Sequence, residues 1–342
     1  MTPRRGEISN EEPAELKRLS PEQQAQWRTY YYGNAGFEER ARAEVAKVVG
    51  VALGDSWFDY LPARLFATGD IIDRLNVESS PYNVLRTAVA GDTIENMIWG
   101  TGYWSDRWTP QDTRQLPGAL KLIRQHNAAF FLCSGGGNDT AGTPFANYLN
   151  HASSRLPPLR QQQLDWLIND YIGASYDEMI RAVRVEKPGL PIILHGYDYP
   201  VADGRGVVNF PLGYHFIGPW LRPAFAMKRI DTQGMINVLA HLIDTFNEML
   251  KKFHNPSQGI YHLDLRNTLA KIKPGDYKAG WVNELHPTDK GFEKIAQAFA
   301  DQIAKALHPA AAGPMLAEQP PPIPETALSP PSRRGRAPRR AK

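Results

Sequence analysis

Cysteine is almost absent from this sequence of 342 residues. Cys133 is the only one, so an intramolecular disulfide cannot form and a reducing compartment is the simpler expectation. The N-terminal segment carries two arginines but lacks the apolar stretch that follows them in a secretory signal. Together these absences predict a cytoplasmic location.

Long hydrophobic runs and a strong net charge are also missing. No apolar run reaches the roughly 18 residues that a membrane-spanning helix needs. The net charge is +3, and residues 309–342 account for it, because they hold six basic and two acidic side chains, a net charge of +4. Residues 1–308 are therefore near −1, and the folded part offers no charge-based case for nucleic-acid binding.

What remains is ordinary for a globular protein, with 42% hydrophobic and 22% charged residues. The length fits one large α/β domain with additions. We assign residues 47–308 to this domain and residues 1–46 to an added helical arm. Residues 309–342 form a tail rich in proline and arginine, with too few apolar side chains to order itself.

Five short apolar segments alternate with longer helical patterns along the main domain. This alternation predicts a parallel five-stranded sheet with helices on both faces, a three-layer α/β/α sandwich. Gly and polar residues gather directly after the segments, at the strand ends where ligands bind in such sheets. The predicted strands are 48–53, 82–90, 128–133, 190–194 and 259–263, and the predicted helices are 113–126, 160–185, 231–253 and 289–307.

Ser56 is the first candidate for chemistry. It ends the sequence Gly54-Asp55-Ser56 after the first strand, and apolar residues at helical spacing begin at Trp57. The serine is thus predicted to lie where a strand becomes a helix, beside unpaired backbone N–H groups that favour an anion. The alternative is that Ser56 only caps that helix.

His286 is the candidate partner of Ser56. It precedes Pro287 in a loop that leads into the last predicted helix, so its backbone is well fixed. As a general base it would take the proton from Ser56 and later return it to the leaving group.

These blocks resemble the SGNH hydrolase family of GDSL-type esterases and lipases. Four of them match in order: the GDS sequence with Ser56, Gly91 after the second strand, Gly136 to Asp139 after the third, and the His-Pro pair at His286. The resemblance implies a flavodoxin-like sandwich with Ser56 as nucleophile and His286 as base. It further implies an oxyanion hole formed by the backbone N–H groups of Ser56 and Gly91 and the side-chain amide of Asn138.

One position departs from the family pattern. The family has an aspartate three residues before the histidine, and this chain has Asn283 there with Glu284 next to it. Asn283 could accept the Nδ1–H of His286 through its carbonyl oxygen, or Glu284 or a backbone carbonyl could do so. Asn283 could also present its amide group instead and favour the wrong tautomer.

Tryptophan gathers in one long connection, and it suggests where a substrate binds. Residues 93–118 hold Trp99, Trp104 and Trp108, which could supply apolar walls around an ester, and Trp57 lies next to the nucleophile. We therefore expect Trp57, Trp99 and Trp104 to contact the substrate.

The sequence as a whole predicts a carboxylic ester hydrolase that acts through a Ser-His acyl-enzyme mechanism. No metal or organic cofactor is implied, and the expected partner is a small-molecule, lipid or carbohydrate ester. The alternative is a non-catalytic binding or scaffold protein that keeps the fold, for which Asn283 is the supporting feature.

Overall fold

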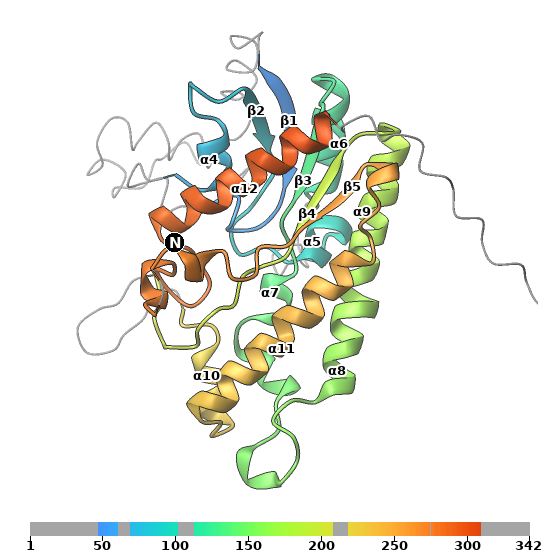
Figure 1. Ribbon diagram of the computed structural model, residues 1–342. Coiled ribbons are helices and arrows are strands. Elements are labelled where there is room, and N and C mark those ends of the chain that lie inside the picture. The colour runs from blue at the N-terminus through green and yellow to red at the C-terminus, as the bar shows by residue number, and fades with distance from the viewer. Residues whose placement is uncertain (1–46, 61–68, 102–112, 208–217, 274, 309–342) are drawn as a thin grey trace, which may run out of the picture. The chain divides into compact units, whose positions relative to one another are not determined.

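The computed structural model describes residues 47–60, 69–101, 113–207, 218–273 and 275–308 (Figure 1). The predicted N-terminal arm and C-terminal tail lie outside these residues, as do Trp104 and Trp108. No helix in the described part of the chain has the length and apolar character needed to cross a membrane.

The five predicted strands form one parallel sheet, in the order β2-β1-β3-β4-β5 (Figure 1). Every residue of β2, β3 and β4 is buried, including the polar Asn83, Arg86 and His195, and β3 is apolar throughout, as a strand covered on both faces can be. The strands are β1 Val48–Leu53, β2 Tyr82–Arg86, β3 Phe130–Cys133, β4 Ile192–His195 and β5 Ile260–Leu263.

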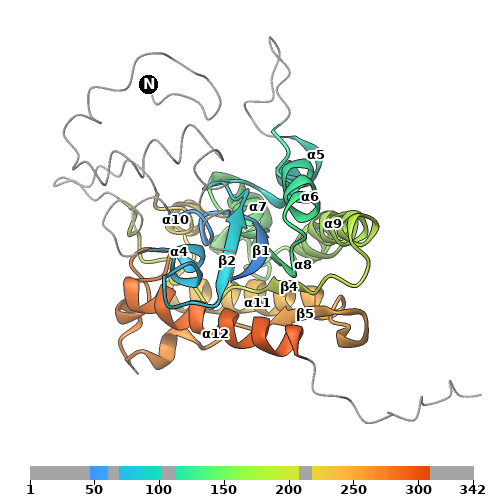
Figure 2. The ribbon, with the colours of Figure 1, turned by 90° about the horizontal axis from the view of Figure 1, so that it is seen from above.

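Helices cover both faces of the sheet, so the predicted three-layer α/β/α architecture is confirmed. α4 and α12 pack together on one face, and α6 and α9 pack together on the other (Figure 2). The ring of Phe246 in α11 meets Tyr176 of α9. The α-helices are α4 Ile71–Leu75, α5 Ile94–Trp99, α6 Leu116–Gln125, α7 Gly137–Thr140, α8 Gln161–Asp165, α9 Gly173–Glu186, α10 Arg222–Met227, α11 Thr232–Lys251 and α12 Asp289–Leu307.

Several shorter helical segments complete the described chain. The predicted single helix 160–185 is α8 and α9 joined by a π-helical stretch, Trp166–Ile172. Short 3₁₀ turns occur at Thr143–Tyr148, Ala152–Ser154, Pro256–Gln258, Leu269–Lys271 and Tyr277–Ala279.

The prediction of a helix starting at Trp57 is wrong. Residues 56–58 form a turn, in which the N–H of Phe58 donates to the carbonyl of Asp55 at 3.1 Å. The first described helix after β1 is α4, and its N-cap is Asp70. The Asp55 carboxylate also accepts the N–H of Trp57, so both hydrogen bonds of this turn end on Asp55.

A buried arginine holds the segment after this turn. The guanidinium of Arg86 donates to the carbonyl of Phe58 at 2.9 Å and to the carboxylates of Asp70 and Asp73, and Asp59 lies 3.8 Å away. Burial alone would lower the pKa of Arg86, but the three carboxylates raise it above its usual range. The end of β2 is therefore tied to the chain that follows the turn and to the start of α4.

Candidate active site

The turn after β1 presents Ser56 at the carboxyl edge of the sheet. Asp55 fixes this turn, because its buried carboxylate accepts from the Trp57 N–H, from the Ser134 hydroxyl at 2.7 Å and from the Tyr197 hydroxyl. Ser134 follows β3 and Tyr197 follows β4, so three neighbouring strand ends meet at one carboxylate. Asp55 therefore has a structural role in holding the turn that carries Ser56.

Ser56 and His286 are in direct contact. The Oγ of Ser56 lies 2.8 Å from Nε2 of His286, although the two residues are 230 positions apart in the chain. His286 belongs to the loop before α12, which is closed by a hydrogen bond from the Val282 N–H to the His286 carbonyl at 3.0 Å. The indole N–H of Trp57 donates to the carbonyl of Leu285 at 3.0 Å, so the two loops are also joined beside the pair.

Asn283 determines which nitrogen of His286 carries the proton. Its Oδ1 accepts the backbone N–H groups of Leu285 at 3.0 Å and His286 at 2.9 Å, so this atom must be the oxygen of the amide. The same Oδ1 lies 3.0 Å from Nδ1 of His286. Nδ1 is therefore the donor, and Nε2 has a free lone pair for the Ser56 hydroxyl. This geometry removes the wrong-tautomer alternative.

Glu284 has a different place. Its carboxylate accepts four backbone N–H groups at 2.7 to 3.0 Å, from Gly204, Trp220, Leu221 and Arg222. Of the two side chains considered as partners of the imidazole, Asn283 makes the contact and Glu284 does not. Glu284 instead fixes the segments around residues 204 and 221 against the His286 loop.

The imidazole of His286 is enclosed by rings and neutral groups. Tyr60 stacks on it with ring centroids 4.3 Å apart, and Trp220 meets it edge-on at 5.5 Å. Burial lowers the pKa of His286 to about 3. Burial also raises the pKa of Tyr60, to about 12, against the hydrogen bond it accepts from Asn283. His286 is therefore neutral, as a base must be, through most of the acidic range.

Gly91 and Asn138, the other predicted oxyanion donors, lie at the same sheet edge. Gly91 has φ +80°, a conformation that favours glycine, and no atom lies within 4 Å of the place where a Cβ would be. The side-chain amide of Asn138 donates one N–H to the carbonyl of Asp92 at 2.9 Å, and its second N–H remains available. Asp139 accepts the N–H of Ile94 at 2.9 Å and so holds α7 against the start of α5.

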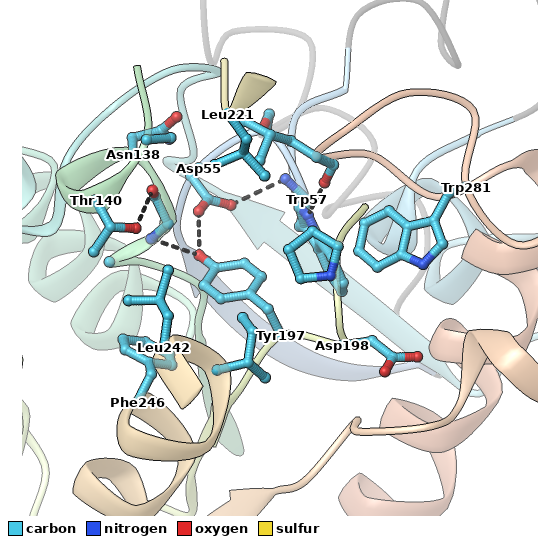
Figure 3. Close-up of a pocket in the computed structure, with 17 residues that line it drawn as sticks. Asp55, Trp57, Asn138, Thr140, Tyr197, Asp198, Leu221, Leu242, Phe246 and Trp281 are labelled. Atoms are coloured by element: carbon cyan, nitrogen blue, oxygen red, sulfur yellow. Dashed lines mark hydrogen bonds between the residues drawn. The ribbon is translucent and has the colours of Figure 1, made fainter. Parts of the chain in front are cut away.

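A pocket adjoins Ser56 (Figure 3). Ser56 and Asn138 line it together, while most of its wall is apolar and comes from α11 and from loops at the carboxyl ends of the strands. The apolar lining residues are Trp57, Ala141, Tyr197, Pro200, Leu221, Leu242, Ile243, Phe246, Trp281 and Leu285.

Two of the three tryptophans expected to contact the substrate are not seen there. Trp57 does line the pocket, but Trp99 is 51% exposed and is not part of the lining, and Trp104 lies outside the described residues. α5 presents the side chain of Trp99 to solvent, so its expected contact with the substrate stays a prediction that this pocket does not support.

The sequence reading missed the contribution of α11. Leu242, Ile243 and Phe246 recur at helical spacing, a pattern that indicates a buried face. Nothing in the pattern distinguishes a face that packs on protein from one that borders a pocket. The only signal for these pocket residues was the apolar stripe of a helix that lies next to the sheet edge with Ser56.

A comparison with models of known protein families gives a match over most of the chain. The model of the GDSL-like Lipase/Acylhydrolase family matches residues 46–294. A search of curated proteins gives no match.

Solved structures with a similar chain course include lipases and esterases. The lipase Lip_vut3 from a goat rumen metagenome is 15% identical, with 75% of this chain and 97% of that chain covered and a TM-score of 0.46. An extracellular lipase from Streptomyces rimosus is 14% identical, with 74% of this chain and 99% of that chain covered and a TM-score of 0.47. A family 3 carbohydrate esterase from Talaromyces cellulolyticus is 11% identical, with 77% of this chain and 100% of that chain covered and a TM-score of 0.39.

Proposed function

Because this chain belongs to the GDSL-like lipase/acylhydrolase family, we propose that it hydrolyses carboxylic esters through an acyl-enzyme formed on Ser56. The observation that carries the proposal is the 2.8 Å contact between Ser56 Oγ and His286 Nε2, with Nδ1 held by Asn283. A nucleophile, a base and a group that orients the base are the three parts that such catalysis requires.

In the first half of the reaction Ser56 Oγ attacks the ester carbonyl carbon while its proton passes to Nε2 of His286. The carbonyl oxygen becomes an oxyanion, which accepts from the backbone N–H groups of Ser56 and Gly91 and from the amide of Asn138. The carbon–oxygen bond to the alcohol then breaks, and the leaving alkoxide takes the proton from Nε2.

In the second half water replaces the alcohol. His286 takes a proton from the water molecule, and the resulting hydroxide attacks the acyl carbon of the Ser56 ester. Collapse of the second oxyanion releases the carboxylic acid and returns the proton to Ser56. The chain ends in its starting state, with no net change in its own protonation.

Asn283 supports this cycle rather than opposing it. A carbonyl oxygen accepts the Nδ1–H as a carboxylate would, although it does not add a negative charge to stabilise the imidazolium. The alternative of a non-catalytic binding protein rested on impaired orientation of His286. The two backbone N–H groups that hold Oδ1 of Asn283 argue against such impairment.

The test is covalent labelling with a fluorophosphonate, followed by mapping of the modified residue. We expect the label on Ser56, and we expect Ser56→Ala to abolish both labelling and hydrolysis of p-nitrophenyl esters. Ser153→Ala is the matched control, because Ser153 is exposed and remote in sequence from every site residue. Equal rates for the wild type and Ser56→Ala would contradict the proposal and favour a binding protein.

A further inference from the structure

The pocket beside Ser56 has polar groups that are already bonded within the protein. Asp55 accepts three hydrogen bonds, and Asp198 accepts the N–H groups of Tyr199, Asn267 and Leu269, each at 2.7 Å. The hydroxyl of Tyr197 donates to Asp55, and that of Thr140 donates to the carbonyl of Gly137 at 2.9 Å. A polar ligand would find few unpaired partners here.

The remaining wall is hydrocarbon. Leu242 and Phe246 of α11 lie on one side of the pocket and Trp281 on the other (Figure 3). Phe246 also packs on the ring of Tyr197, with centroids 5.6 Å apart, and supports it from below. No arginine or lysine is among the described residues that line the pocket, so nothing there pairs with a phosphate or a carboxylate.

The chemistry of ester cleavage indicates which half of the ester lies in this pocket. The alcohol oxygen must reach Nε2 of His286 to take its proton, so the alcohol lies on the His286 side. Ser56 and Asn138 line the pocket, and His286 itself does not, although Trp281 and Leu285 of its loop do. Because the nucleophile and an oxyanion donor both border the pocket, we place in it the acyl chain, the part of the substrate that is bonded to Ser56 in the acyl-enzyme.

We propose that this pocket binds the hydrocarbon chain of the acyl group, so the protein prefers esters of medium-chain fatty acids to acetates. This inference rests on the proposed ester hydrolysis at Ser56. Deacetylation of a carbohydrate would leave the apolar wall formed by α11 without a partner.

The expected size of the preference follows from the burial of methylene groups. Each buried CH₂ contributes ~0.8 kcal/mol, which is about a fourfold gain in kcat/KM. From acetyl to butyryl, two methylenes are added, and we expect a gain of about fifteenfold. The gain should stop when the chain fills the pocket.

The experiment compares two ester series on the wild-type protein. In the first the alcohol is p-nitrophenol and the acyl group is acetyl, butyryl, hexanoyl or octanoyl. In the second the acyl group is acetyl and the alcohol lengthens from ethanol to octanol. We expect kcat/KM to rise along the first series and to stay nearly constant along the second. A rise along the second series only would overturn the inference.

Variants of Leu242 test the pocket itself. Leu242→Trp fills the space and should lower the octanoyl-to-acetyl ratio of kcat/KM at least tenfold, and Leu242→Ala should move the optimum to longer chains. Ile236→Trp adds the same ring on the exposed side of α11, where Ile236 is 50% exposed, and should leave the ratio unchanged. An unchanged ratio in both Leu242 variants would contradict the proposed pocket.

The two proposals fail in different ways. If no ester is hydrolysed in a Ser56-dependent manner, the proposed function is wrong. If Ser56-dependent hydrolysis occurs but kcat/KM is the same for acetyl and octanoyl esters, only the assignment of the acyl pocket is wrong.

Discussion

At the scale of single residues, the partner of the His286 imidazole determines the pH range of the site. Asn283 brings an oxygen to Nδ1 without bringing a charge, and Tyr60 and Trp220 enclose the ring. The carboxylate of Glu284 next to it is engaged with four backbone N–H groups. Tyr60, which stacks on the ring, is neutral below its raised pKa.

Ester hydrolysis should therefore persist in acid. An ordinary histidine protonates near pH 6.5 and then stops acting as a base, whereas burial lowers the pKa of His286 to about 3. We expect kcat/KM, which reports groups of the free enzyme, to be nearly constant between pH 7 and about 5. A fall by half near pH 6.5 would contradict this.

Asn283→Asp should narrow the pH range over which kcat/KM stays constant. A carboxylate at the same place would stabilise the imidazolium, raise the pKa of His286 and shift the acid limb of the kcat/KM profile upward by about one pH unit or more. Asn237→Asp, at an exposed position of α11, adds the same charge at a distance and should leave the limb in place. The measurement is the pH profile of p-nitrophenyl butyrate hydrolysis for the three proteins.

The sequence motifs predicted the catalytic pair but not every contact around it. Ser56 and His286 could be paired from their motifs, and the structure brings them into contact. The choice between Asn283 and Glu284 could not be made, because it depends on which backbone N–H groups each side chain meets after folding. The exposure of Trp99 was not predictable for a similar reason, since aromatic composition does not state which side of a short helix faces solvent.

At the scale of elements, the buried ion cluster around Arg86 joins the end of β2 to the segment after Ser56 and to α4. The Arg86 side chain is 3% exposed, and the Asp59 and Asp70 side chains are 2% and 0% exposed. Removing the cation would take a positive charge away from these buried carboxylates.

Arg86→Met should therefore destabilise the fold by about 3 to 5 kcal/mol, measured by urea denaturation. Arg124→Met is the matched control. Arg124 pairs with Glu186 in α9, but its side chain is 67% exposed, so its loss should cost less than about 1 kcal/mol. If both variants lose a similar free energy of unfolding, the buried cluster contributes no more to stability than an exposed ion pair.

The secondary structure was predicted correctly where the pattern of apolar residues matches the residues that are buried in the fold. The first strand was predicted with the bounds it has, and α12 was predicted over its full length, because its apolar stripe and Thr288 cap are local signals. Where a helix was expected to begin at Trp57, residues 56–58 form a turn in which Asp55 accepts the N–H groups of Trp57 and Phe58, two contacts that periodicity does not contain.

At the scale of the whole molecule, close contacts between β4 and α11 hold the pocket wall in place. Gly196 directly follows β4, and a Cβ added to it would lie 1.8 Å from Oδ1 of Asn247 in α11. Asn247 is itself buried and lies 3.1 Å from His262 of β5. Glycine is therefore required where the sheet edge meets this helix.

Gly196→Ala should lower the free energy of unfolding by about 1 to 3 kcal/mol, because the methyl group must push α11 away. The displaced helix should also weaken any preference for longer acyl chains. Gly118→Ala is the control: Gly118 lies in α6 with its nearest neighbour at 3.5 Å, and alanine there should be neutral or stabilising by up to ~1 kcal/mol. Thermal and urea unfolding of both variants provide the comparison.

The architecture was predictable because strands and helices alternate and parallel connections are right-handed, which leaves few arrangements. The placement of α11 beside Ser56 was not. It depends on contacts such as that of Gly196 with Asn247, between residues 51 positions apart, which no local pattern specifies.

The distance along the chain between Ser56 and His286 also affects when the site can form during synthesis. A ribosome makes the nucleophile early, and 230 further residues must follow before its base exists. Trp57 likewise has no Leu285 carbonyl to meet until then. An emerging polypeptide thus carries an inert alcohol, and reactivity begins only when synthesis has reached the loop that precedes α12.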